Sequence, residues 1–219
     1  MPRLRARVAA LAILLSAASC SRQTESPATA PAPPAAESRE DPAATSGRVA
    51  GAVGGFARSA SIVVVLEPQT ARTFAPQDEK PVMDQVGQAF GPDLLIVRTG
   101  QPVEFRNNDD TLHNVHVNHD ETREPAFNVA IPTGGAYTYS FPRDGFYHVA
   151  CDIHPSMSAS IFATTTPFAT LADADGRFAF EDVPMGAWHL HVYALGRHLQ
   201  RDVEVRGGVN EVRLESGVE

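Results

Sequence analysis

Three observations predict an all-β fold for this chain of 219 residues. Beyond residue 46 the apolar residues form short runs rich in Val, Ile, Phe and Tyr, which favour strands. Gly, Pro, Asn and Asp separate these runs, and these residues favour turns. No segment beyond residue 46 has the apolar period of a helix. Short strands with frequent turns predict closure into a sandwich or barrel.

Residues 1–19 have the features of a secretory signal peptide. Arg3, Arg5 and Arg7 precede an apolar run over 8–15, and small residues follow it. This order is typical of an export signal, and the run is too short to span a bilayer. We therefore expect a periplasmic protein.

Cys20 follows this leader directly. The stretch 15–20 resembles a bacterial lipobox, which implies that Cys20 is lipidated and anchors the mature chain to the envelope membrane. Ala17 stands where a branched apolar residue is usual, so a soluble periplasmic product is the alternative.

Residues 20–46 predict a disordered tether. They are rich in Pro, Ala, Ser, Thr and Glu, as in Pro31-Ala32-Pro33-Pro34, and they have no apolar period. Such a composition cannot bury enough apolar surface to offset the entropy lost on ordering. We expect the tether to give the folded part reach from the membrane.

The charge balance excludes one class of partner. The chain carries 18 Lys and Arg against 26 Asp and Glu, a formal net charge of −8. Because phosphate binding needs a basic patch, we expect no nucleic-acid partner. A partner with a basic surface suits this sign, because opposite charges steer encounter.

Residues 47–68 and 80–164 each contain predicted strands. The first segment has runs at 48–53 and 62–66. The second segment has runs at 94–97, 103–105, 114–117, 136–141, 145–150 and 160–163.

Residues 166–216 form another predicted β unit. A turn at 173–176 precedes a strand at 177–180 and an alternating aromatic strand at 188–193. This rhythm resembles the carboxypeptidase-regulatory-like, transthyretin-type sandwich, whose usual opening strands are missing here and are found at 47–67 instead. The resemblance implies one discontinuous sandwich, formed by 47–68 and 166–216, into which 80–164 is inserted. The alternative is a set of units that follow one another in sequence order.

Four side chains in two distant stretches could hold a metal ion. Cys151, His154 and Met157 lie in Cys-Asp-Ile-His-Pro-Ser-Met, and His113 lies upstream in Leu-His-Asn-Val-His. A thiolate, two imidazoles and a thioether are the donors of a mononuclear blue-copper site, in which Met is the long axial ligand. Pro155 fixes its own φ and restricts the residue before it, which stiffens the turn. The sequence therefore predicts one copper ion and one-electron chemistry.

These motifs resemble those of the cupredoxins, and of the amicyanin type in particular, over roughly residues 82–163. Similar combined chains are often labelled methylamine-utilisation or plastocyanin-like proteins. The resemblance implies a Greek-key β-sandwich, with His113 and His154 as imidazole ligands, Cys151 as thiolate and Met157 as axial ligand. It also implies that Asn114 supports the site, its backbone N–H donating to the Cys151 sulfur and its side chain holding the ligand loop.

Other histidines have ordinary explanations. We expect His116 and His119 on the surface or beside the ligands, with His116 on the side of Asn114, because neighbouring strand residues alternate between faces. His148 faces away from Cys151 by the same argument. His189 and His191 share a strand face, a spacing that could bind a surface metal, although a solvated strand position is the commoner explanation.

The leading hypothesis is a periplasmic or membrane-tethered blue copper protein that carries electrons between redox partners such as a cytochrome or a dehydrogenase. We expect no enzyme, because four protein ligands leave little room for a substrate, and no zinc or serine-nucleophile motif is present. We also expect no disulfide, because Cys20 and Cys151 lie in a leader and a core strand end. One alternative is a copper carrier or sensor without electron transfer, and another is a metal-free envelope interaction module.

Overall fold

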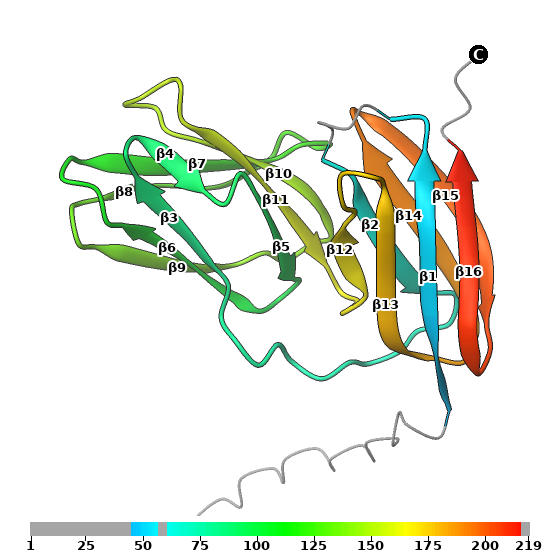
Figure 1. The fold of residues 1–219 in the computed structure, drawn as a ribbon. Coiled ribbons are helices and arrows are strands. Elements are labelled where there is room, and N and C mark those ends of the chain that lie inside the picture. The colour runs from blue at the N-terminus through cyan, green and yellow to red at the C-terminus, as the bar shows by residue number, and fades with distance from the viewer. Residues whose placement is uncertain (1–44, 57–60, 216–219) are drawn as a thin grey trace, which may run out of the picture. The chain divides into compact units, whose positions relative to one another are not determined.

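The computed structural model describes residues 45–56 and 61–215, and these ranges are all-β, as predicted (Figure 1). Within them sixteen strands form four sheets. The expected signal peptide, Cys20 and all but the end of the expected tether lie outside the described residues. No helix in the described ranges is long and apolar enough to cross a membrane.

One sandwich comprises the central part of the chain, from Val82 to Thr164. Its five-stranded sheet has the order β5 (Leu94–Arg98), β11 (Ser158–Thr164), β10 (Gly145–Ala150), β7 (His113–His119) and β8 (Pro125–Ile131). Its four-stranded sheet has the order β4 (Ala89–Gly91), β3 (Val82–Val86), β6 (Pro102–Asn107) and β9 (Ala136–Ser140). Alternate side chains of these strands, such as Val103 and Phe105 of β6, fill one apolar core.

A second sandwich combines strands from both sides of this central part (Figure 1). One sheet has the order β13 (Arg177–Pro184), β1 (Ser46–Gly54) and β16 (Gly208–Glu215). The other has the order β12 (Ala169–Leu171), β2 (Val63–Pro68), β14 (Gly186–Ala194) and β15 (Arg197–Val205). Strand β1 pairs with β16 in parallel and with β13 in antiparallel fashion.

The apolar run of β2 is buried on both of its faces. Val64 and Leu66 belong to the core of the second sandwich. Val63 and Val65 form a separate apolar cluster with Phe162 of β11. A strand that packs against apolar groups on both faces needs a continuous apolar run, and this explains why its sequence does not alternate.

Two neighbouring strands bring the predicted ligands to one end of the five-stranded sheet. Strand β7 begins at His113, and Cys151 follows the last residue of β10. The two strands pair in antiparallel fashion, with Ala150 opposite His116. The start of β7 and the end of β10 therefore lie at the same edge.

Candidate metal centre

Three of the predicted ligands converge on one point. One donor atom each from His113, Cys151 and His154 lies within 4.8 Å of the others. The two imidazole Nδ1 atoms of His113 and His154 are 2.9 Å apart, and the Cys151 Sγ is 3.8 Å from His154 Nδ1. No other such group of three His, Cys, Asp or Glu side chains occurs among the residues that the structure describes.

These separations fit a shared metal ion. Nitrogen and sulfur atoms that bind one ion at about 2.0 and 2.3 Å lie about 3.7 Å apart at the 120° angle of a trigonal plane. Two nitrogens at about 2.0 Å from an ion lie about 2.8 Å apart at a right angle. A thiolate with two imidazoles is the donor set that suits copper, so the residues present fit the ion that the sequence predicts.

The loop after β10 is short and hydrogen-bonded to itself. The backbone N–H of Cys151 donates to the carbonyl of Met157 at 3.2 Å, and the N–H of Met157 donates to the carbonyl of His154 at 2.9 Å. Met157 is buried in the same apolar cluster as Cys151. The loop thus turns the predicted axial ligand inward, next to the thiolate ligand.

Asp109, a residue that the sequence analysis did not single out, holds the His113 ring. The Asp109 carboxylate lies 2.9 Å from His113 Nε2, and the His113 side chain is fully buried. A hydrogen bond from the Gln88 backbone N–H, and then that of His113, lowers the pKa of Asp109 to about 2. A carboxylate behind a ligand imidazole fixes the ring and directs its other nitrogen to the ion. Asp109 precedes His113 by four residues, and this spacing alone does not predict that the two side chains meet.

Asn114 holds the ligand loop through its side chain. Its Oδ1 accepts hydrogen bonds from the backbone N–H groups of Asp152 at 2.7 Å and Ile153 at 3.3 Å. Its Nδ2 donates to Asn128 Oδ1 and Asp152 Oδ2. The Cys151 sulfur lies 3.3 Å from Asn114 Oδ1, so the structure gives the contact to sulfur through the side chain rather than through the expected backbone N–H.

The remaining histidines of this sandwich stand apart from the three donors. His116 lies on the side of Asn114, as expected, and its Nδ1 is 2.9 Å from Asp152 Oδ1. This contact is the main reason that the pKa of Asp152 is lowered. His148 is exposed. The surface position expected for His119 is wrong, because His119 ends the row of β7 residues that face the core and packs edge-on against Tyr147 at 4.8 Å.

Exposed apolar side chains flank the site. Leu112 and Ile153 are 48% and 46% exposed, and each precedes one of the imidazole residues. His154 is only partly buried, whereas His113 is fully buried. Of these two predicted ligands, the His154 ring is therefore the one that is closer to solvent.

Comparisons with known proteins find a family match for the central part of the chain. Residues 80–163 match the family described as copper binding proteins, plastocyanin/azurin family. No curated protein matches the chain. Among solved structures, a purple cupredoxin from Nitrosopumilus maritimus is 20% identical, with a TM-score of 0.35, covering 39% of this chain and 100% of its own. A reduced amicyanin variant is 22% identical, with a TM-score of 0.36, covering 45% of this chain and 98% of its own.

A third solved structure is that of an enzyme, and the match covers part of its chain. The copper-containing nitrite reductase from Thermus scotoductus is 27% identical, with a TM-score of 0.37, over 45% of this chain and 25% of its own. The family match extends over β7, which begins at His113, and over the loop after β10 that contains Cys151, His154 and Met157. The central part of this chain, residues 80–163, is thus similar to the copper binding proteins of the plastocyanin/azurin family.

Proposed function

We propose that the protein is a type 1 copper protein that carries single electrons between redox partners. The observation that carries this proposal is the convergence of His113 Nδ1, His154 Nδ1 and Cys151 Sγ at the end of two paired strands. Met157 supplies the long axial contact from the same loop. Bound copper would supply the one-electron chemistry, and the chain would hold its ligands in place.

The surroundings of the donors favour electron transfer over catalysis. His113, Cys151 and Met157 are buried, and Asp109 and Asn114 hold the ligand segments by hydrogen bonds. Ligands that are fixed in this way rearrange little when the charge of the ion changes. A site with protein donors on all sides leaves little room for a substrate, so we propose a carrier and not an enzyme.

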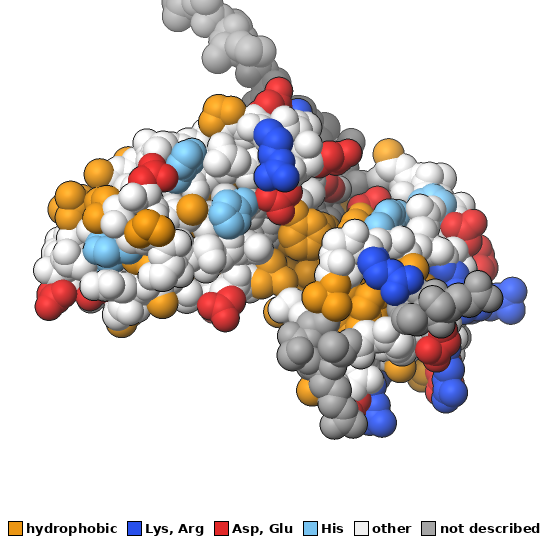
Figure 2. Space-filling view, turned by 90° about the horizontal axis from the view of Figure 1, so that it is seen from above, with side chains coloured by type: hydrophobic (Ala, Val, Ile, Leu, Met, Phe, Trp, Pro, Cys, Tyr) orange, Lys and Arg blue, Asp and Glu red, His pale blue; other side chains and the backbone are white. Residues whose placement is uncertain are grey.

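The partner would dock at the partly exposed His154 ring. Ile153 and Leu112 give this area an apolar surface, and Figure 2 shows other exposed hydrophobic side chains scattered among charged ones. A small apolar contact with a charged rim suits a transient redox complex. The net charge of −8 favours a basic partner surface, such as that of a cytochrome or a dehydrogenase.

We further propose that the protein is exported and that the second sandwich is a carboxypeptidase-regulatory-like accessory domain. The basic and apolar leader and Cys20 support export and lipid anchoring. The pairing of β1 and β2 with the strands beyond residue 168 supports an interrupted domain. Replacing Cys20 with Ala should move the protein from the membrane fraction to the soluble periplasmic fraction, and an unchanged distribution would refute lipid anchoring.

The visible spectrum of the copper-loaded full chain tests the main proposal. Wild type should show intense thiolate-to-copper charge transfer, and Cys151→Ser should lose it because serine offers no sulfur. His148→Gln, which changes an exposed histidine of β10, should keep the band and serves as the control. A wild-type protein that takes up copper without this band would refute a type 1 site.

A further inference from the structure

A row of polar side chains lies on strand β7, next to the candidate metal centre. Asn114, His116 and Asn118 alternate along β7 with valines whose side chains fill the apolar core. Strand β8 pairs with β7 so that Asn128 stands opposite His116. Because neighbouring strand residues alternate between faces, these four side chains share the face of the sheet that is turned away from the core.

The carboxylate of Asp152 connects this polar row to the ligand loop. Its Oδ2 accepts hydrogen bonds from Asn114 Nδ2 at 3.0 Å and from Asn128 Nδ2 at 2.8 Å. Its Oδ1 lies 2.9 Å from His116 Nδ1. Asp152 directly follows Cys151 in the chain. Side chains from two strands therefore hold the residue next to the predicted thiolate ligand.

The contacts of the polar row fit a neutral His116 imidazole. An ionised carboxylate can only accept, so the proton of the ring belongs on Nδ1, which donates to Asp152. The Nε2 atom is then an acceptor, and Asn118 Nδ2 donates to it at 3.2 Å. Asn114 Nδ2 donates to Asn128 Oδ1 at 2.9 Å. Each side chain of the row thus has a partner, and the donors around the Asp152 carboxylate are neutral.

We propose that Asp152 is a positioning residue of the metal centre: with Asn128 and His116 it fixes the ligand loop, and it places a negative charge beside the Cys151 sulfur. The first role acts on the chain with or without a metal ion. The second role rests on the proposed function, because a fixed charge changes the reduction potential only of an ion that gains and loses an electron.

The positioning role should be local. The Asp152 side chain is 52% exposed, so its hydrogen bonds compete with water and should add little to the global stability of the chain. Donors on two strands nevertheless oppose opening of the loop that Asp152 begins. Local opening of this kind is detected by the hydrogen exchange of the backbone amides in the loop. A loop that is ordered before the ion binds needs little rearrangement to hold it.

The charge of Asp152 should lower the reduction potential of bound copper. A negative charge stabilises Cu²⁺ more than Cu⁺, because the Coulomb energy grows with the charge of the ion. Among the described residues only His116 forms an ion-pair contact with Asp152, and its imidazole is neutral in this arrangement. No Lys or Arg of these residues therefore cancels the charge. Because Asp152 is half exposed, salt should screen the effect.

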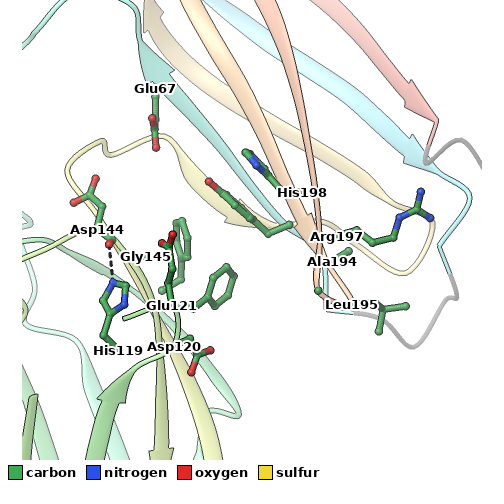
Figure 3. A pocket seen from close by; sticks show the side chains of 14 residues that line it. Glu67, His119, Asp120, Glu121, Asp144, Gly145, Ala194, Leu195, Arg197 and His198 are labelled. Atoms are coloured by element: carbon green, nitrogen blue, oxygen red, sulfur yellow. Dashed lines mark hydrogen bonds between the residues drawn. The ribbon is translucent and has the colours of Figure 1, made fainter. Parts of the chain in front are cut away.

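Voltammetry of the copper-loaded full chain tests the charge. Asp152→Asn keeps the shape of the side chain and should raise the potential at about 0.1 M salt, by an amount that shrinks at about 1 M. Glu121→Gln removes the same charge beyond the other end of β7, where Glu121 lines a pocket with Asp120 and Asp144 (Figure 3). The seven residues of β7 separate its ends by about 20 Å. This exceeds the Debye length of about 10 Å, so the control should keep the wild-type potential.

Amide hydrogen exchange in the metal-free full chain tests the positioning. Asn128→Ala keeps the charge of Asp152 but removes one of its donors, so the Asp152 and Ile153 amides should exchange about fivefold faster. Thr138→Ala changes an exposed residue of β9 and should leave their exchange unchanged. Both replaced side chains are exposed, so urea unfolding should be that of wild type and should show that the change is local.

The outcomes separate this proposal from the type 1 assignment. Absence of thiolate-to-copper charge transfer in wild type would refute the assignment, whereas the exchange experiment needs no copper. A potential of Asp152→Asn that equals or lies below that of wild type would overturn the charge role, as would an equal rise in Glu121→Gln. Equal amide exchange in Asn128→Ala and Thr138→Ala would overturn the positioning role.

Discussion

The two imidazole pairs of this molecule have the same spacing but different surroundings. The ring nitrogens of His113 and His154 lie 2.9 Å apart, as do those of His191 and His198. In each pair a carboxylate lies near the other nitrogen of the buried ring. Only the pair of His113 and His154 has a sulfur donor beside it, the Cys151 Sγ at 3.8 Å. A thiolate selects copper and supports one-electron transfer, whereas imidazoles alone make a weaker, less selective site. The comparison indicates that imidazole spacing alone does not identify a metal site. The sulfur donor and the direction of the rings, with centroids 4.7 Å apart at 65° against 5.1 Å at 15°, distinguish the pair beside Cys151.

The pairs also differ in how the chain builds them. His113 and His154 come from segments 41 residues apart, which are joined by the pairing of β7 with β10 and by the hydrogen bonds of Asn114 to the ligand loop. His191 and His198 are 7 residues apart in one hairpin. The first pair therefore depends on long-range folding, and the second depends on a local turn together with the sheet beneath it.

The largest effect should come from removing the core beneath the second pair. Trp188 is fully buried, and its Nε1–H donates to the Pro184 carbonyl at 2.9 Å. Trp188→Ala should lower the free energy of unfolding by about 3–5 kcal/mol. Urea unfolding followed by circular dichroism measures this. The exposed Met185→Ala is the matched control, and a loss below about 1 kcal/mol in Trp188→Ala would contradict the core assigned here.

A smaller effect should come from the Asp109 carboxylate, which contacts His113 and so belongs to the first pair only. Asp109→Asn keeps the shape of the side chain but removes its charge, so it should hold the His113 ring less firmly. We expect copper affinity to fall about 10- to 100-fold, with a shift in the reduction potential. Competition with a chelator, followed by the thiolate-to-copper band, measures this. Asp110→Asn is the control, and unchanged affinity in Asp109→Asn would show that the contact orients nothing.

Removing the Asn114 side chain should lower the folding stability of the ligand loop but should leave copper bound. Asn114→Ala leaves the Asp152 and Ile153 N–H groups without their acceptor, which should cost about 1 kcal/mol of folding free energy. The copper band should persist with a changed reduction potential, because a group next to the sulfur is lost. Urea unfolding and voltammetry measure the two effects. An unchanged potential would be inconsistent with the role given to Asn114.

The smallest effect is a pH dependence that belongs to the second pair alone. Burial lowers the pKa of His191 to about 4 from its ordinary 6.5, so the unfolded chain binds more protons between these values. The stability that His191 contributes is therefore complete above about pH 6.5 and is lost as the pH falls toward 4. The titratable groups that face it are Glu67, His189, Tyr193 and His198.

Urea unfolding of the metal-free chain at pH 7 and pH 5 measures this dependence. His191→Asn removes the imidazole and should lose less stability than wild type between the two pH values. His148→Gln, which changes an exposed imidazole, should behave as wild type. The same loss in all three proteins would mean that His191 is not a buried neutral group.

The sequence predicted the β class and the metal ligands for different reasons. Short runs such as 145–150 carry their own strand signal, and Cys151, His154 and Met157 lie within one loop that the sequence shows directly. The structure adds strands β3, β4, β8 and β12, which the sequence analysis did not predict. Strand β8 lies at a sheet edge, and its alternating apolar residues Phe127, Val129 and Ile131, which pack on the core, are a strand signal that the sequence analysis missed.

The sequence pattern did not predict which side chains meet across turns and neighbouring strands. The support of His113 by Asp109 depends on where the turn before β7 places a carboxylate, which no spacing encodes. The burial of His119 was missed because a polar residue can end a row of core residues when a ring such as Tyr147 covers it. The approach of His191 and His198 depends on strand register, and register follows from a turn whose first residue, Leu195, is not a typical turn residue.

The central claim is that Cys151, His113 and His154 bind one copper ion. X-ray absorption at the copper edge, on the full chain loaded with one equivalent of copper, tests it most directly. We expect one short copper–sulfur distance and two copper–nitrogen distances, with the sulfur contribution absent after Cys151→Ser. A spectrum with nitrogen and oxygen neighbours only, or a short sulfur distance that survives Cys151→Ser, would contradict the account.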